Sequence, residues 1–141
     1  MSKDFFRHIF NVQQGVEAVP PNEKIASWAL NLLSLIYTER SDDFASSPDE
    51  IALRFQALEK ELTFILNATK ACSNCDNREK SSQFFRDVTE IYRILNTDID
   101  AIVNGDPAAR SRFEVIRAYP GFYAIFFYRI AHALLELDLP L

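Results

Sequence analysis

Apolar residues recur along the chain at steps of three and four, which is the period of an amphipathic α-helix. The clearest stripe runs over about four turns and consists of Ile25, Trp28, Ala29, Leu32, Leu33 and Ile36. No stretch of strict apolar–polar alternation is long enough to predict a β-sheet. We therefore expect an all-α fold, a bundle of about six to eight helices.

The same pattern locates the other expected helices. They comprise an opening helix with Phe5, Phe6, Ile9 and Phe10 on one side, helices over about residues 51–66, 81–95 and 98–103, one that begins at Asp106, and a last one after Pro120. The helix near residue 51 has a well-formed start, since Ser47 can accept from the amide of Glu50, whose side chain can reach back, and Pro48 takes the first helical position.

The stretch "NGDPAAR" links two of the expected helices. We expect Asn104-Gly105 to end the shorter one, because glycine tolerates the positive φ that a helix end often needs. Asp106-Pro107 is then expected to begin the next helix, with the carboxylate capping its first amides. A cap needs only one carboxylate oxygen, so the other oxygen of Asp106 can accept from a ligand's ammonium or hydroxyl group.

The segment "YPGFYAIFFYRIAHAL", residues 119–134, is apolar on nearly every side of a helix. Because soluble monomers rarely expose large apolar patches, we expect this last helix to contact its own bundle on one side and another surface on the other. Arg129 and His132 are expected to hydrogen-bond backbone carbonyls or a carboxylate across such a contact. We favour a structural over a catalytic role for His132, because no serine or cysteine nucleophile is arranged with it.

Composition narrows the class of protein. The chain has 141 residues, of which 48% are hydrophobic and only 3 are glycine, and its net charge is −5. One helical domain over residues 1–141 is expected, and without a block of lysine and arginine we expect neither a nucleic-acid partner nor an anionic-membrane surface. The start lacks a signal-peptide pattern, and Arg129 and His132 interrupt the only candidate membrane span, so the cytoplasm is the expected location.

Cys72 and Cys75 form a lone C-x-x-C in the polar stretch "ATKACSNCDNREK". A redox motif would be expected next to a βαβ pattern, and a zinc site would need two further ligands. Two reduced cysteines in a loop are the favoured reading, and no metal is expected.

Residues 98–141 resemble the end of the helical N-terminal domain of serine O-acetyltransferases. The resemblance rests on an Asp-Ile start, a D-P-A box, a "GF-x-A" turn and a "YRI-x-H" helix, which here are Asp98-Ile99, Asp106-Pro107-Ala108, Gly121-Phe122-Tyr123-Ala124 and residues 128–132. Residues 1–97 match only in being helical and of suitable length. Two positions depart from the family pattern, since many members have arginine where this chain has Gly105 and histidine where it has Tyr123.

The resemblance implies acetyl transfer from acetyl-CoA to the hydroxyl of L-serine, the reaction that opens cysteine biosynthesis. In the family the general base and the acetyl-CoA groove belong to a C-terminal β-helix of hexapeptide repeats. This chain shows no such repeat, so we expect it to be the front part of a longer enzyme, inactive alone, with no catalytic or cofactor-binding residue of its own. Asp106, with Pro107 beside it, is expected to bind serine and the inhibitor L-cysteine.

The resemblance also implies partners. In the family the helical domains join trimers into a hexamer, and cysteine synthase binds a C-terminal tail that is absent here. Two other readings stay open: a non-catalytic helical assembly module that shares the aromatic helix, and a redox or metal protein that uses Cys72 and Cys75.

Overall fold

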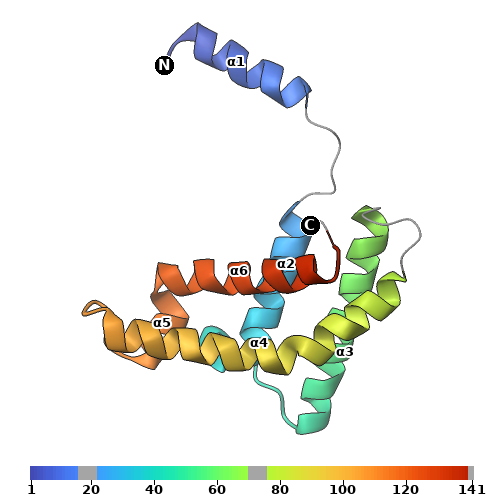
Figure 1. Cartoon of the computed structure of the whole chain (residues 1–141), viewed down its shortest axis with the longest axis vertical. Helices are drawn as coiled ribbons and strands as arrows, with labels where there is room; N and C mark the ends of the chain where they lie inside the picture. Colours follow the sequence, from blue (N-terminus) through green and yellow to red (C-terminus); the bar gives the residue numbers. More distant parts are fainter. Residues whose placement is uncertain (16–21, 70–75, 140–141) are drawn as a thin grey trace.

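A computed structural model describes residues 1–15, 22–69 and 76–139 of the chain. Within these residues the structure is helical and contains no strand, which confirms the all-α prediction (Figure 1). The elements in chain order are α1 (Lys3–Gln14), α2 (Asn22–Ile36), the 3-10 helix η1 (Thr38–Arg40), α3 (Pro48–Thr69), α4 (Asn77–Gly105), α5 (Arg112–Ala118) and α6 (Pro120–Glu136).

Helix α4 is the central helix of the fold, since α3, α5 and α6 all contact it. The two helices expected over residues 81–95 and 98–103 are one helix of 29 residues, so that division was wrong. Nothing between Leu95 and Ile99 breaks the helix, and its buried stripe passes through both residues without a change of period. Helix α6 runs alongside α4, while α3 crosses near the start of α4 and α5 lies near its end (Figure 1).

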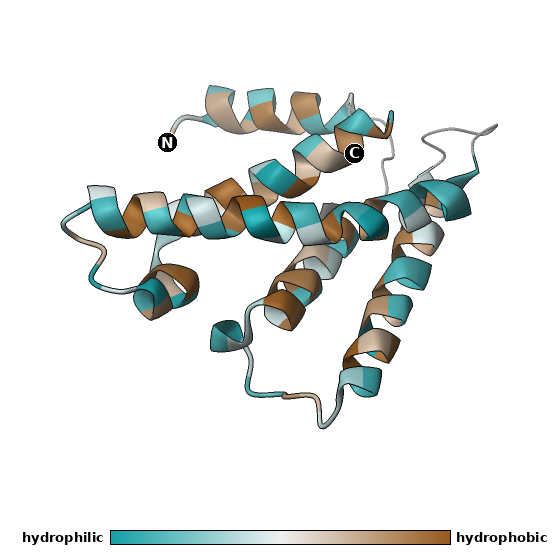
Figure 2. Ribbon diagram, turned by 60° about the horizontal axis from the view of Figure 1, so that its bottom comes forward, coloured by the Kyte–Doolittle hydropathy of each residue, from teal (hydrophilic) through white to brown (hydrophobic). Residues whose placement is uncertain are grey.

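The core lies where these helices meet, and each helix carries apolar and polar residues on different faces (Figure 2). Trp28 of α2 is fully buried against Phe84 of α4, with ring centroids 5.4 Å apart. Its indole Nε1 donates to the carbonyl of Leu58 in α3 at 2.9 Å. One side chain thus joins three helices and has its only polar atom satisfied.

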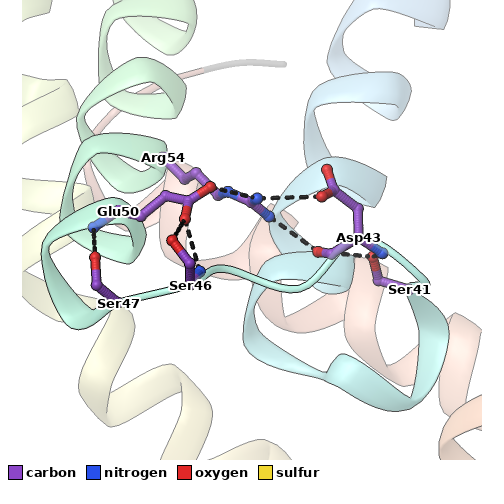
Figure 3. Close-up of polar contacts among 6 residues, drawn as sticks. All are labelled: Ser41, Asp43, Ser46, Ser47, Glu50 and Arg54. Atoms are coloured by element: carbon purple, nitrogen blue, oxygen red, sulfur yellow. Dashed lines mark hydrogen bonds and ion pairs between the residues drawn. The ribbon is translucent and has the colours of Figure 1, made fainter.

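The start of α3 agrees with the expected capping pattern in its main part (Figure 3). Ser47 Oγ accepts from the amide of Glu50 at 3.1 Å. The Glu50 carboxylate, however, reaches the amide and hydroxyl of Ser46, both at 2.6 Å, rather than the amide of Ser47. Arg54 then bridges Glu50 and Asp43 at 2.9 and 3.2 Å, which ties the preceding loop to the helix.

Helix α1 forms as expected but its apolar side is not covered. Phe5, Phe6, Ile9 and Phe10 are between 39% and 58% exposed, and no residue of α1 is buried. Figure 1 shows α1 standing away from the other helices.

Helix α6 has one buried face and one open face. Phe122, Phe126, Ile130 and Leu134 are buried, whereas Tyr128 and Leu135 are exposed. None of the helices in the described ranges is long and apolar enough to cross a lipid bilayer.

Candidate functional site

The D-P-A box lies in the turn between α4 and α5, not at a helix start. The amide of Asp106 donates to the carbonyl of Ile102 at 3.0 Å and so completes the last turn of α4. Helix α5 begins only at Arg112, where Ser111 Oγ accepts from the amide of Glu114 at 3.1 Å. The expected helix start at Asp106 was therefore wrong.

A local signal for the true start is present in the sequence. Ser111 and Glu114 have the spacing of a capping box, and this box lies closer to the apolar pair Val115 and Ile116 than Asp106 does. The expected positive φ at Gly105 was also wrong, since no glycine in the described residues has one. Helix α4 ends without a left-handed residue because the Asp106 amide still reaches back to α4.

Two groups of the chain hold the Asp106 carboxylate. Its Oδ1 accepts from the amide of Ala108 at 2.9 Å, and its Oδ2 accepts from the hydroxyl of Tyr119. The oxygen that we expected to be available to a ligand therefore already has one donor. Each carboxylate oxygen offers about two acceptor sites, so one site remains on each oxygen. Asp106 is partly exposed and Pro107 is exposed, so solutes can reach both.

These contacts keep Asp106 ionised. The hydroxyl of Tyr119 and then the amide of Ala108 hold the pKa of the Asp106 carboxyl below its ordinary value, because both donate to the charged form. The same hydrogen bond raises the pKa of Tyr119, so its phenol keeps its proton. At neutral pH the turn thus presents one negative charge with a neutral donor beside it.

Tyr119 reaches Asp106 because of its neighbours at the start of α6. A Cβ atom on Gly121 would lie 2.7 Å from Cε1 of the Tyr119 ring, which real side chains do not tolerate. Phe122 is fully buried and meets Tyr37 edge-on, with centroids 5.5 Å apart. The glycine of the "GF-x-A" turn therefore makes room for the tyrosine, and the phenylalanine anchors the helix start.

Sequence reasoning missed Tyr119 as a contact of Asp106. The two residues are 13 positions apart and are separated by the whole of α5, so no helical period relates them.

Arg129 and His132 make contacts within the chain. Arg129 forms a two-pronged ion pair with Asp98 of α4, at 3.0 and 2.9 Å, and the Asp98 side chain is only 16% exposed. The expectation of a carboxylate partner for Arg129 is confirmed, and this contact joins α6 to α4. His132 Nε2 lies 3.0 Å from Glu136 of the same helix, and its ring stacks on Tyr128.

The described residues contain no group of three histidine, cysteine, aspartate or glutamate side chains placed to hold a metal ion. Cys72 and Cys75 lie outside the described residues.

Comparison with known proteins agrees with the motif pattern. A sequence model of the family described as "Serine acetyltransferase, N-terminal" matches residues 39–126, which is more than half of the chain. The chain is 43% identical over 74 residues to a plasmid-encoded serine acetyltransferase of Synechococcus elongatus. It is 58% identical over 43 residues to the serine acetyltransferase of Bacillus subtilis, and 45% identical over 40 residues to that of Helicobacter pylori.

These matches cover 52%, 30% and 28% of this chain. They cover only 23%, 20% and 23% of the respective relatives, so the similarity concerns a fraction of each enzyme's length. The D-P-A box and the Tyr119–Gly121 segment that holds it both fall inside the range matched by the family model. By that match and by its helical fold, the chain belongs to the family of serine acetyltransferase N-terminal domains.

Proposed function

We propose that this chain is the N-terminal part of a serine O-acetyltransferase in which Asp106 binds the amino group of L-serine. The observation that carries the proposal is the state of this carboxylate: it is ionised, accessible, fixed by two donors and left with one acceptor site on each oxygen. Such a group suits an ammonium ion, which brings both a positive charge and several N–H donors.

The proposed reaction joins the serine hydroxyl oxygen to the acetyl carbon of acetyl-CoA. The hydroxyl proton passes to a general base and the carbon–sulfur bond of the thioester breaks. The base then gives that proton to the sulfur, so that coenzyme A leaves as the thiol. A serine hydroxyl is a poor nucleophile at neutral pH, so the base has to lie within hydrogen-bond reach of it. We place that base and the acetyl-CoA groove outside these 141 residues.

Asp106 binds the amino group of the substrate and not the hydroxyl that reacts. It holds the α-ammonium group and so orients the amino acid, while Pro107 forms an adjacent part of the surface. L-cysteine carries the same α-ammonium group, so the same contact would serve inhibition by cysteine. This role makes Asp106 a binding residue rather than a proton carrier.

Self-association is part of the proposal. The uncovered apolar side of α1 and the exposed Tyr128 and Leu135 of α6 are surfaces that a second subunit would cover. We assign them to contacts that join trimers into a hexamer, and we place any contact with cysteine synthase on a C-terminal tail beyond residue 141. The uncovered α1 face is equally the observation that favours the second candidate, a helical assembly module without a role in substrate binding.

Substitution of the carboxylate tests the proposal. In the full-length enzyme, Asp106→Ala should raise the KM for serine roughly ten- to hundred-fold, because a hydrogen bond to a charged group contributes about 1.5–3 kcal/mol. The KM for acetyl-CoA should stay within about two-fold. Asp100→Ala is the matched control, since Asp100 is an exposed carboxylate of α4 with one long ion pair, to Arg112 at 3.6 Å. An unchanged serine KM in Asp106→Ala would leave Asp106 as a structural residue and favour the assembly module.

The 141-residue chain itself provides a second test. We expect it to show no turnover with acetyl-CoA and serine in a thiol-release assay, because the proposed general base lies outside it. The full-length enzyme is the positive control, and turnover by the shorter chain would contradict the proposed division of roles.

A further inference from the structure

We infer that Tyr119 is a positioning residue of the serine site: its hydroxyl fixes the Asp106 carboxylate in the orientation that receives the substrate's ammonium group. This inference rests on the proposed function and adds a residue to it. Tyr119 acts through Asp106 and does not itself touch the reacting atoms.

One donor alone would leave the carboxylate poorly oriented. The amide of Ala108 holds Oδ1 from within the same turn, two residues away. Around this single contact the carboxylate can still rotate about its last side-chain bond, since that torsion is broad for aspartate. Tyr119, the residue directly before α6, holds the other oxygen, and the two contacts together fix the plane of the group.

The chemistry of the donor fits this role. A lysine or arginine at position 119 would orient the carboxylate but would also neutralise the charge that attracts an ammonium ion. A phenol donates one hydrogen bond and stays neutral, because its pKa is raised by the same contact. Tyrosine therefore orients Asp106 and leaves its charge for the ligand.

Gly121 extends the inference by one step. A side chain there would meet Cε1 and Cδ1 of the Tyr119 ring at 2.7 and 3.3 Å, so the ring would have to leave its place. The helix cannot shift to make room, since Phe122 and Phe126 of the same helix are fully buried in the core. The glycine thus contributes to the site by permitting the ring position.

The test compares three variants of the full-length enzyme. Tyr119→Phe keeps the ring and removes only the hydroxyl, and it should raise the serine KM roughly three- to thirty-fold, at or below the effect of one hydrogen bond to a charged group. Its kcat and its KM for acetyl-CoA should stay within about two-fold, because the contact holds the substrate equally in the ground and transition states. Gly121→Ala should give the same pattern by displacing the ring. Tyr92→Phe is the control: it removes the hydroxyl of an exposed tyrosine of α4 and should leave the KM for serine unchanged.

A double-mutant cycle separates this role from a purely structural one. In the Asp106→Ala background, Tyr119→Phe should cause no further rise in the serine KM, because the group that it positions is gone. Additive effects would overturn the inference, and so would an unchanged serine KM in Tyr119→Phe when Asp106→Ala raises it; the proposed function would survive both results. An unchanged KM in Asp106→Ala would instead end the proposed function, and the inference with it. Thermal unfolding of each variant checks that the fold is kept.

Discussion

At the residue scale, two glycines of the motif region differ in how much space surrounds them. Gly121 is required by the position of the Tyr119 ring, as described above. Gly105 has no such constraint, since an added Cβ would meet nothing within 4 Å and its φ is not positive. A Cβ atom at this position would therefore meet no steric obstacle in this backbone.

Gly105→Ala should accordingly stabilise the protein. Alanine restricts the unfolded chain more than glycine does and fits the last turn of α4, so the free energy of unfolding should rise by about 0.4–1 kcal/mol. Urea unfolding followed by circular dichroism measures this change. Gly121→Ala is the variant for comparison, because its added Cβ would meet the Tyr119 ring. A loss of stability in Gly105→Ala would show a constraint at position 105 that its open surroundings do not suggest.

The second departure, Tyr123, also has a structural explanation. The guanidinium of Arg40 lies 4.2 Å from the centre of the Tyr123 ring, a cation–π contact. Arg40 in turn donates to the carbonyl of Ile116 at 2.9 Å near the end of α5. Tyrosine at this position thus helps to hold η1 against α5, which a charged histidine would do less well.

At the scale of single elements, the start of α3 depends on an ionised glutamate. The contacts of Glu50 with Ser46, followed by the contact with Arg54, lower the pKa of the Glu50 carboxyl to about 2 from an ordinary value of 4.5. A carboxyl whose pKa is lower in the folded state contributes its full stabilisation above its unfolded pKa and loses it as the pH falls. For Glu50 the loss should run from about pH 4.5 down to about pH 2.

Glu50→Gln should remove this part of the acid sensitivity. The variant should be less stable than the wild type at pH 7, and the difference should shrink as the pH falls toward 3, because protonation then weakens the wild-type contacts too. Chemical unfolding of both proteins at the two pH values gives the comparison. A difference that stays constant with pH would mean that the charge of Glu50 has no part in the cap. Glu39→Gln is a suitable control, because Glu39 also lies in the first turn of a helix, η1, whose start has no side-chain cap.

At the scale of the whole molecule, stability resides in the helices around α4. Helices α2, α3, α5 and α6 all contribute fully buried residues to one core, and α1 contributes none. The ion pair of Arg129 with Asp98 adds a polar link between α6 and α4.

Removal of residues 1–15 should therefore leave the fold of the remaining chain intact. We expect the free energy of unfolding to change by less than about 0.5 kcal/mol, as for surface changes that bury nothing, when dilute samples are compared by thermal or urea unfolding. The same truncation should weaken self-association in analytical ultracentrifugation, if the apolar side of α1 is an intersubunit surface. A large loss of stability in dilute monomer would show that α1 packs on its own bundle.

The pattern of apolar positions determined the fold class and most helices by itself. Trp28, Leu58 and Phe84 lie on stripes whose period is visible in the sequence, because burial requires one continuous apolar face on each helix. The cap at Ser47 was equally predictable, since its donor and acceptor lie three residues apart. Local reasoning about Asp106 predicted a helix cap with a second oxygen available to a ligand, whereas the expected binding of serine came from the likeness of the D-P-A box to a family.

Only the tertiary structure decided how that carboxylate is held. It replaced the expected helix start at Asp106 by a turn, because α4 continues through residue 105 and the capping box at Ser111 begins the next helix. It also brought Tyr119 to Asp106 across 13 positions, a contact set by the packing of α6 on α4. Contacts within one turn of a helix follow from spacing along the chain, whereas a contact between elements depends on how their buried faces pack together, which spacing alone does not contain.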